Sequence, residues 1–311
     1  MSLRTPAALK LEPITSADFP RLEPLFARQR NRYSAYTLPS ILCWSNDLYH
    51  PVAALDGDTL VVGYEFSHDG ETRHLILPIS PTKDPSPEYV LALAKDLGFA
   101  SCGLVPEDWI LRHGREKVES LFRVEELEGY ADYVYLAESL AKLEGRDYAK
   151  KRNLVRQFNR DYVDKGRFEA REMRASDAPE VEAFLEEWCR QIGCDEERNL
   201  ELRCEKRAAI HAIRNVSAFK TPSLLARVDG DVSAFGIAAR ATDDLGVLLF
   251  EKAFAGHKGL YQFFDQLCAQ RLFPGLKYID KECDMGDEGL AKAKRSYYPV
   301  EMIRAFRLSV R

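Results

Sequence analysis

The sequence predicts an α/β protein in which one unit with a mixed sheet occurs twice in tandem. A strand and a helix open each half, because Asp18 and Asp177 stand in matching patterns of apolar residues and prolines. A hairpin signal follows in each half, where Asp56 and Asp229 each precede a glycine between two apolar strands. Two landmarks repeated in the same order indicate an internal duplication.

Each predicted unit then continues as strand, helix and strand. These segments cover residues 74–79, 87–97 and 100–104 in the first half, and residues 247–252, 260–272 and 277–282 in the second. The strands are short apolar runs that end in polar residues or glycine, whereas the helices carry apolar residues at helical spacing. We therefore expect a first domain at 1–136, a linking basic helix at 137–165 and a second domain at 166–311.

Composition suits a globular protein with a substantial core. The chain has 311 residues, of which 46% are hydrophobic and 30% charged, and its net charge is −5. No apolar run reaches the roughly 18 residues of a membrane span, and no secretory leader is evident. The seven cysteines are odd in number and lack a Cys-x-x-Cys pair. This pattern predicts free thiols in a reducing cytoplasm and no metal site.

The predicted linking helix is basic on one side. Tyr148 and Phe158 mark its apolar face, and an arginine ridge occupies the opposite face at i, i+4 and i+8, formed by Arg152, Arg156 and Arg160. Such a ridge can follow a phosphate backbone or a layer of lipid headgroups, although a solvated basic face has the same pattern.

Lys151 breaks the pattern of this helix, because it falls within the apolar face. A lysine in that position either reaches the rim or points into a cleft. With Arg152 and Asn153 it forms a Lys-Arg-Asn tripeptide, which we regard as a candidate for substrate or phosphate binding together with Arg156.

Polar residues gather where two strands of the second half end. Lys252 closes the strand at 247–252, Asp280 lies near the end of the strand at 277–282, and Asp284 follows that strand. In open α/β sheets, ligands bind beyond the carboxyl ends of the strands. We therefore expect the active cleft in the second half, with the two aspartates accepting a proton or fixing the acceptor.

A glycine loop precedes the helix at 260–272. The backbone N–H groups of Gly256 and Gly259 lie at a helix start, where they suit an anion such as a terminal phosphate, although a plain turn fits equally well. His257 within this loop is a candidate base, or simply a solvated histidine.

The last predicted helix carries two lysines, Lys292 and Lys294, that could stabilise an oxyanion or bind phosphate, as could Lys252. Lys292 and Lys294 are two residues apart, about 200° around a helix, and cannot both face one cleft. We expect Leu290 to anchor the helix and to place Lys294 inward. The sequence thus favours Asp284 and Lys294 as a functional pair, with ion pairs as the alternative.

Several motifs together resemble one family. They are Asp132-Tyr133-Val134-Tyr135, Lys151-Arg152-Asn153, Phe250-Glu251-Lys252-Ala253, Gly259-Leu260-Tyr261 and the closing Asp284-x-Gly286-x-x-Gly289-Leu290-x-Lys292-Ala293-Lys294-x-Ser296-Tyr297-x-Pro299. The chain resembles the uncharacterised-domain family related to the soluble C-terminal domain of phosphatidylglycerol lysyltransferases. The resemblance covers nearly the whole chain, and the closing motif is its most specific part.

The resemblance implies a tandem GNAT-type acyltransferase fold akin to the Fem-type peptidyltransferases. It implies transfer of an aminoacyl group from aminoacyl-tRNA, without a separate cofactor, to a lipid hydroxyl or a soluble acceptor, with peripheral contact to anionic lipid. It also adds Tyr261 and Tyr297 to the substrate-binding candidates. A CoA-dependent N-acetyltransferase is one alternative, although a fuller glycine-rich phosphate loop would be expected. The other is a non-catalytic RNA-binding module that uses the arginine ridge.

Overall fold

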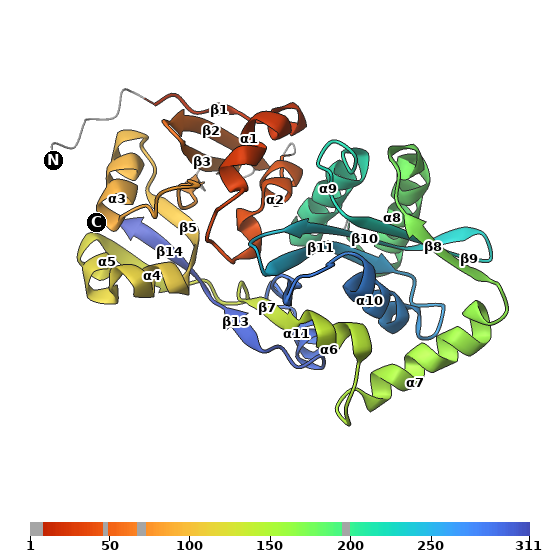
Figure 1. Ribbon diagram of the computed structural model, residues 1–311. Helices are drawn as coiled ribbons and strands as arrows, with labels where there is room; N and C mark the ends of the chain where they lie inside the picture. Colours follow the sequence, from red (N-terminus) through yellow and green to blue (C-terminus); the bar gives the residue numbers. More distant parts are fainter. Residues whose placement is uncertain (1–8, 46–48, 67–72, 195–199) are drawn as a thin grey trace. The chain divides into compact units, whose positions relative to one another are not determined.

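The computed structural model describes residues 9–45, 49–66, 73–194 and 200–311 (Figure 1). The chain forms two compact units. The first unit comprises Met1–Asp132, Cys283–Gly286 and Ile303–Arg311, and the second comprises Tyr133–Glu282 and Asp287–Met302.

The first unit is built on a mixed sheet whose strands lie in the order β1-β2-β3-β4-β5-β14-β6. Only β4 and β5 run parallel among the strand pairs whose register is described. The strands are β1 (Glu12–Pro13), β2 (Tyr49–Asp56), β3 (Thr59–Phe66), β4 (His74–Leu75), β5 (Ser101–Pro106), β6 (Phe122–Glu126) and β14 (Ala305–Val310). The helices are α1 (Phe19–Phe26), α2 (Leu38–Cys43), α3 (Pro87–Asp96), α4 (Glu107–His113) and α5 (Arg115–Leu121).

The second unit has a sheet of the order β13-β7-β12-β11-β10-β9-β8. Its strands are β7 (Asp132–Leu136), β8 (Phe168–Glu172), β9 (Ser223–Val228), β10 (Asp231–Arg240), β11 (Leu245–Ala253), β12 (Tyr278–Asp280) and β13 (Glu301–Ile303). Its helices are α6 (Ala137–Lys142), α7 (Ala149–Phe158), α8 (Ala178–Ile192), α9 (Leu200–Arg214), α10 (Leu260–Arg271) and α11 (Glu288–Arg295). A π-helical turn, Asn159–Val163, extends α7.

The predicted duplication is confirmed by the topology. Read from β1 and from β8, the two sheets correspond position by position, and the fourth and fifth strands form the parallel pair in each. The two Asp-Gly turns join the second and third strands, with Asp56 paired to Thr59 in one unit and Val228 to Asp231 in the other. The predicted fold class, α/β with mixed sheets, is therefore correct.

The units differ from the predicted division at 136 and 166. The strand β7 lies in the second unit's sheet, and β14 at the end of the chain lies in the first unit's sheet. These strands occupy the same sixth position of the two sheets. A local pattern of apolar residues predicts a strand at each place but does not specify which sheet will take it.

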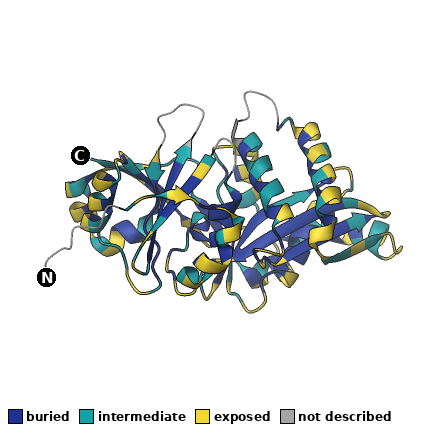
Figure 2. Ribbon diagram, turned by 90° about the horizontal axis from the view of Figure 1, so that it is seen from above, coloured by how far each residue is buried: buried dark blue, intermediate teal, exposed yellow. Residues whose placement is uncertain are grey.

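Helices cover both faces of the second unit's sheet, with α8 on one face and α10 on the other (Figure 1). The strands are therefore mostly buried, as the dark blue ribbons of Figure 2 show. The apolar run Val247–Phe250 is buried along its length, as a strand covered on both faces requires. Gly236 in β10 allows α10 to pack closely, because a Cβ there would lie 2.8 Å from Cys268 Sγ.

The prediction that all cysteines are free thiols is wrong for one pair. Cys189 and Cys194 form a disulfide with a Cα–Cα distance of 5.0 Å. Gly193 ends α8 in the left-handed conformation and turns the chain back, so that Cys194 N donates to the Cys189 carbonyl. The pairing depends on this turn rather than on a Cys-x-x-Cys spacing.

Candidate functional site

The two parallel strands of the second unit separate toward their carboxyl ends. The ladder between β11 and β12 ends at the pair Val247–Asp280, whereas β11 continues to Ala253 beside β10. The chain after β12 follows β7 instead, since Lys281 N donates to the Tyr133 carbonyl. The gap between diverging parallel strands is the place where α/β sheets bind ligands.

Three charged side chains meet in this gap. Lys281 Nζ lies 3.1 Å from Glu251 Oε2 and 2.6 Å from Asp265 Oδ1. Glu251 comes from the end of β11, Lys281 from the residue after β12, and Asp265 from the buried side of α10. We call these three residues together with Tyr297 and Lys151 the charged cluster.

The carboxylate of Glu251 is only half satisfied. Its Oε1 atom is buried and has no hydrogen-bond partner among the described residues. Burial raises the pKa of Glu251 to about 7, against the attraction of Lys281. A buried carboxyl group with a pKa near neutrality and a free oxygen is suited to accept and return a proton.

The other groups of the cluster are also perturbed. Burial opposes the charge of Lys281, but the carboxylates of Asp265 and Glu251 outweigh it and raise the pKa of this lysine well above its usual range. Burial also raises the pKa of Tyr297, whose hydroxyl is hydrogen-bonded to Asp265. The cluster therefore holds a lysine ammonium group between two carboxyl groups, and burial raises the pKa of one of them, Glu251, to about 7.

Lys151 joins the cluster from α7. Its Nζ donates to Ser296 Oγ at 2.7 Å and lies 3.8 Å from the ring centroid of Tyr297, a cation–π contact. Burial lowers the pKa of Lys151. Of the two placements that the sequence left open, the structure has Lys151 pointing inward.

Two tyrosines, one in β7 and one at the start of α7, hold the closing motif by hydrogen bonds. Tyr148 Oη donates to the Tyr297 carbonyl at 2.8 Å, and Tyr135 Oη donates to the Lys294 carbonyl at 2.9 Å. These bonds hold Tyr297 beside Lys151. Tyr261, at the start of α10, donates its hydroxyl to the Glu251 carbonyl, and part of the Tyr261 surface is exposed.

The predicted acids have local hydrogen bonds of their own. Asp280 is fully buried, and its Oδ1 accepts from Glu282 N at 2.7 Å. Asp284 belongs to the first unit, and its Oδ1 accepts from Gly286 N at 2.9 Å. The N-terminal cap of α11 is made by Asp287, whose side chain accepts from Leu290 N.

The two closing lysines face different ways, as the helical spacing predicts. Lys294 Nζ donates to the carbonyls of Lys281 and Glu282, the latter at 3.0 Å, whereas Lys292 is exposed. The expected anchor is wrong, because Leu290 is exposed and Ala291 is the buried residue of α11. The first turn of α11 is rotated so that the small residue packs inward.

Lys252 and the glycine loop have structural partners. Lys252 Nζ lies 2.6 Å from Glu205 Oε1 and 4.7 Å from the Trp188 ring centroid. Gly259 has φ 87° and approaches the Leu154 carbonyl so closely that a Cβ would clash. His257 Nδ1 lies 3.3 Å from Tyr162 Oη, and Gly256 sits in an exposed turn. Close packing of α10 on α7 thus accounts for Gly259 without a bound phosphate.

The arginine ridge is not a row of free cations. Arg152 donates to the carbonyls of Leu143 and Gly145, where α6 ends. Arg160, which lies in the π-helical turn, makes two bonds to its sequence neighbour Asp161. Arg156 remains exposed beside Asn153, with a contact of 3.5 Å. The three arginines therefore stand in different surroundings, and their binding of a polyanion stays a prediction.

The residues that sequence reasoning missed are Glu251, Asp265 and Lys281. A usable signal was present for Asp265, which stands among Leu260, Phe264 and Cys268 on the buried side of its helix. A carboxylate at such a position needs a buried cation. Lys281 follows the neighbouring parallel strand and could have been paired with it on that ground.

The corresponding gap of the first unit is filled by a tyrosine. Tyr36 is fully buried, and its hydroxyl accepts from Leu77 N at 3.1 Å and donates to the Leu104 carbonyl at 3.2 Å. Leu77 follows β4 and Leu104 lies in β5, so the hydroxyl bridges the two strands that diverge. This bridge occupies the position that holds the charged cluster in the second unit.

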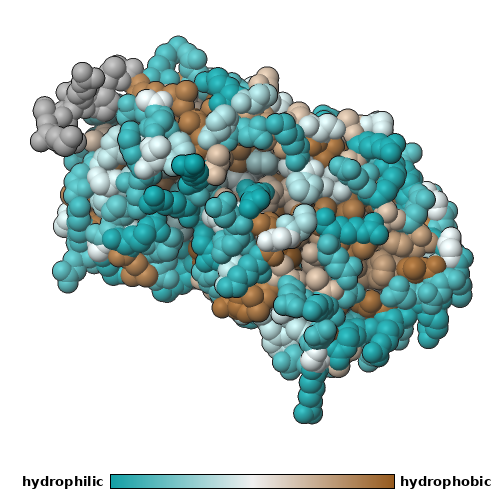
Figure 3. Space-filling view, viewed as in Figure 1, coloured by the Kyte–Doolittle hydropathy of each residue, from teal (hydrophilic) through white to brown (hydrophobic). Residues whose placement is uncertain are grey.

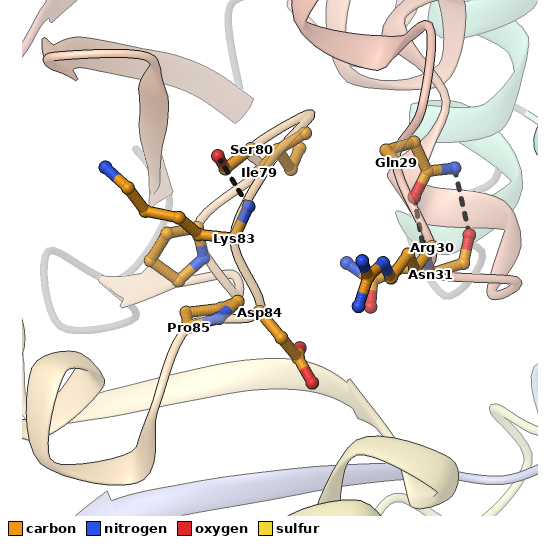
Figure 4. A pocket seen from close by; sticks show the side chains of 9 residues that line it. Gln29, Arg30, Asn31, Ile79, Ser80, Lys83, Asp84 and Pro85 are labelled. Atoms are coloured by element: carbon orange, nitrogen blue, oxygen red, sulfur yellow. Dashed lines mark hydrogen bonds between the residues drawn. The ribbon is translucent and has the colours of Figure 1, made fainter.

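A small polar pocket lies elsewhere in the first unit (Figure 4). Its walls are residues 29–31 and the loop 78–85 before α3. Ser80 Oγ accepts from Lys83 N, and the Gln29 amide bonds to the backbone of Asn31, so both sides of the pocket are braced internally. The pocket contains none of the predicted site residues.

Metal-ligand groups and membrane-spanning helices are both absent from the described residues. No group of three or more His, Cys, Asp or Glu side chains is placed to hold a metal ion in the described ranges. Within the same ranges, every helix falls short of the length and apolarity that a bilayer crossing would need.

The solved structures that resemble this one include the following two. A conserved protein of unknown function from Bacteroides thetaiotaomicron has a TM-score of 0.85 and 25% identity, with 97% of this chain and 100% of that chain covered. The C-terminal domain of a putative lysylphosphatidylglycerol synthetase from Agrobacterium fabrum has a TM-score of 0.64 and 13% identity, with 94% and 92% covered. The second likeness concerns the fold alone.

Sequence comparison is more specific. No curated protein matches the chain. The family described as phosphatidylglycerol lysyltransferase, C-terminal, matches residues 42–308, which include every member of the charged cluster. The chain therefore belongs to the family of the C-terminal domain of phosphatidylglycerol lysyltransferases.

Proposed function

We propose that this acyltransferase moves an aminoacyl group from aminoacyl-tRNA to a hydroxyl or amino group of a lipid or soluble acceptor. The observation that carries the proposal is the free, buried Oε1 of Glu251 in a carboxyl group whose pKa is raised to about 7. An aminoacyl ester is already activated, so the reaction needs positioning, a proton acceptor and charge stabilisation, and no further cofactor.

In the proposed reaction, Glu251 accepts the proton of the acceptor as the acceptor attacks the ester carbonyl. A bond forms between the acceptor and the carbonyl carbon, and the ester bond to the tRNA ribose breaks. Glu251 then returns its proton to the departing ribose oxygen. The same carboxyl group therefore serves as base and acid, for which a pKa near neutrality is best.

Two lysines have different tasks in this scheme. Lys281 is bound to both Glu251 and Asp265, so it fixes the orientation of the base. Lys151 stands at the edge of the cluster, and its ammonium group can donate to the carbonyl oxygen as negative charge develops there. The Tyr297 ring contacts both cations, with its centroid 3.8 Å from Lys151 Nζ and 5.2 Å from Lys281 Nζ.

Placement in the second unit is supported by the contrast between the two sheets. In the first unit the gap between the parallel strands is bridged by the Tyr36 hydroxyl, which leaves that position without an ionised acid or base. The Glu251 carboxylate stands at the matching gap of the second unit. We therefore assign one active site to the chain.

The test is a transfer assay with two donors, an uncharged-tRNA control and a Glu251→Gln variant. Labelled aminoacyl-tRNA, acetyl-CoA and uncharged tRNA are offered with lipid vesicles or with soluble hydroxyl and amine acceptors. We expect transfer from aminoacyl-tRNA, and a loss of roughly a hundredfold to ten-thousandfold in Glu251→Gln. The matched control is Glu138→Gln, because Glu138 is exposed and pairs only with Lys142 on the surface of α6.

Each outcome decides a specific point. Transfer from acetyl-CoA alone would assign the chain to the N-acetyltransferases and overturn the donor. Full activity of Glu251→Gln with aminoacyl-tRNA would remove Glu251 as the base. Binding of tRNA without any transfer would favour the RNA-binding alternative.

A further inference from the structure

We propose that an edge of the second unit, formed by Tyr298, Val300, Met302, Lys292 and Arg295, docks on an anionic lipid surface. We call these five residues the docking edge. The inference rests on the proposed function, because it states how an acceptor in a membrane would reach the charged cluster. The binding event itself can be measured without any transfer.

The apolar part of the docking edge is unusually exposed. Tyr298 is 48% exposed, Val300 53% and Met302 39%. Val300 and Met302 point to the same side, since side chains alternate along a strand. Single exposed apolar residues are ordinary, but a run of them along one edge marks an interaction surface. Apolar surface is visible near the place of β13 in the space-filling view (Figure 3).

This run lies at the edge of a sheet, where β13 is the last strand beside β7. Edge strands are normally protected by charged residues, because their open side can pair with other chains. Here Glu301 alternates with Val300 and Met302, so its side chain is directed to the other side of the strand. The apolar side of the edge is left for a partner.

Cations stand directly before this run. Lys292 and Arg295 are spaced at i and i+3 on α11 and so lie on one side of that helix, and Tyr298 follows three residues after the helix ends, where its N–H donates to the Arg295 carbonyl. Lys292 and Arg295 are exposed, and neither side chain forms an ion pair with any residue that the structure describes. Free cations beside an apolar and aromatic surface complement anionic headgroups above acyl chains.

The docking edge is continuous with the charged cluster. Tyr297 is buried in the cluster, whereas the next residue, Tyr298, is at the surface with its ring 5.5 Å from that of Tyr148. Tyr148 in turn holds the Tyr297 carbonyl. A headgroup that meets Tyr298 therefore lies one residue from the cluster. Nucleic acids are bound mainly through contacts between cations and phosphates, which Val300 and Met302 do not offer. We therefore infer a membrane as the partner.

The test is sedimentation of the full chain with vesicles. One vesicle type is phosphatidylcholine alone, and the other is phosphatidylcholine with a minor fraction of phosphatidylglycerol. We expect the chain to bind the anionic vesicles, and binding to fall with added salt. Two double variants test the surface: Val300→Glu with Met302→Glu, and Lys292→Glu with Arg295→Glu. Each should lower the affinity for anionic vesicles by about tenfold or more.

Leu111→Glu is the matched control, because Leu111 is 61% exposed in the first unit and outside the docking edge. It should bind vesicles as the unaltered chain does, and thermal unfolding should show that both double variants remain folded. Equal vesicle binding by all variants would overturn the proposal. So would loss of tRNA binding in the lysine–arginine variant with vesicle binding retained, which would assign the edge to nucleic acid.

Failure of this proposal and failure of the proposed function can be told apart. Glu251→Gln should lose transfer and keep vesicle binding. A chain that binds anionic vesicles but transfers nothing would contradict the proposed function alone. A chain that transfers to a soluble acceptor but never binds vesicles would contradict the docking edge alone.

Discussion

Lys281 contacts only one side of the Glu251 carboxylate: its Nζ lies 3.1 Å from Oε2, and Oε1 has no hydrogen-bond partner among the described residues. A buried acceptor without a partner costs about 1–3 kcal/mol. Such a cost is expected where an atom is held ready for a substrate. The asymmetry also means that ionisation of Glu251 can be changed by ligands that reach Oε1.

The first prediction concerns pH and rate. Because burial raises the pKa of Glu251 to about 7, the carboxylate that accepts the proton forms only as pH rises through that value. We expect kcat/KM for transfer to rise with pH and to level off above about 7. The profile of Glu251→Gln, measured on its residual activity, should lack this rise.

The pH dependence of stability is the control for assigning the rate profile to Glu251, because the raised pKa of Glu251 also changes the free energy of unfolding in a known direction. The folded chain holds the Glu251 proton up to about pH 7, whereas the unfolded chain releases it near 4.5. Folding therefore binds a proton between these values, and the contribution of Glu251 to stability falls as pH rises through that window. Urea unfolding of Glu251→Gln should lose this part of the slope. An unchanged slope would place the titration on another group.

The second prediction concerns the buried cation. Lys281→Met leaves Glu251 and Asp265 together in a buried place without a positive charge. Breaking a buried pair from one side lowers the free energy of unfolding by about 3–5 kcal/mol. Lys142→Met is the control, since its exposed pair with Glu138 should contribute only about 0–1 kcal/mol. Urea unfolding near neutral pH measures both, and similar losses would refute a special role for Lys281.

Sequence reasoning located the fold better than the site, for a physical reason. Asp-Gly turns and apolar periods are local, so they predicted both hairpins and the helix that became α10. These local patterns could not predict that β14 joins the sheet of the first unit, because the apolar pattern of a buried strand is the same whichever sheet it joins. Motifs did place Lys151 and Tyr297 in one site, and these two residues are in contact.

The charged residues whose roles or partners the sequence did not predict have one feature in common: their partners are distant in the sequence. Glu251, Asp265 and Lys281 come from three elements, and their burial is set by packing between them. Arg152 appeared free in sequence because its acceptors are backbone carbonyls at the end of α6. The sequence shows which side chains are charged. It indicates the ion-pair or hydrogen-bond partner of a charged side chain only when that partner is close in the sequence.

The third prediction separates the two units. In Tyr36→Phe, Leu77 N and the Leu104 carbonyl lose the hydroxyl that joins them. We expect the free energy of unfolding to fall by about 1–3 kcal/mol, as for buried polar groups that lose a partner. The kcat of the folded protein should stay the same, because we assign no chemistry to this gap. A large fall in kcat at unchanged stability would show that the first unit takes part in transfer.

The fourth prediction concerns the two lysines of the closing helix. Lys294 Nζ donates to the carbonyls of Lys281 and Glu282, which directly follow β12. Lys294→Met removes both bonds at once, so the free energy of unfolding should fall by about 1–3 kcal/mol. Because the freed carbonyl belongs to Lys281, the ion pairs of Lys281 should also loosen, and kcat should fall.

Lys292→Met is the matched change in the same helix. Its side chain is exposed, so its effect on stability should stay within about 0.5 kcal/mol. Transfer to a soluble acceptor distinguishes the two lysines, because that assay does not depend on vesicle binding. The expected order is a clear loss for Lys294→Met and a small change for Lys292→Met. Equal losses would show that Lys294 does not act by holding the carbonyls beside the charged cluster.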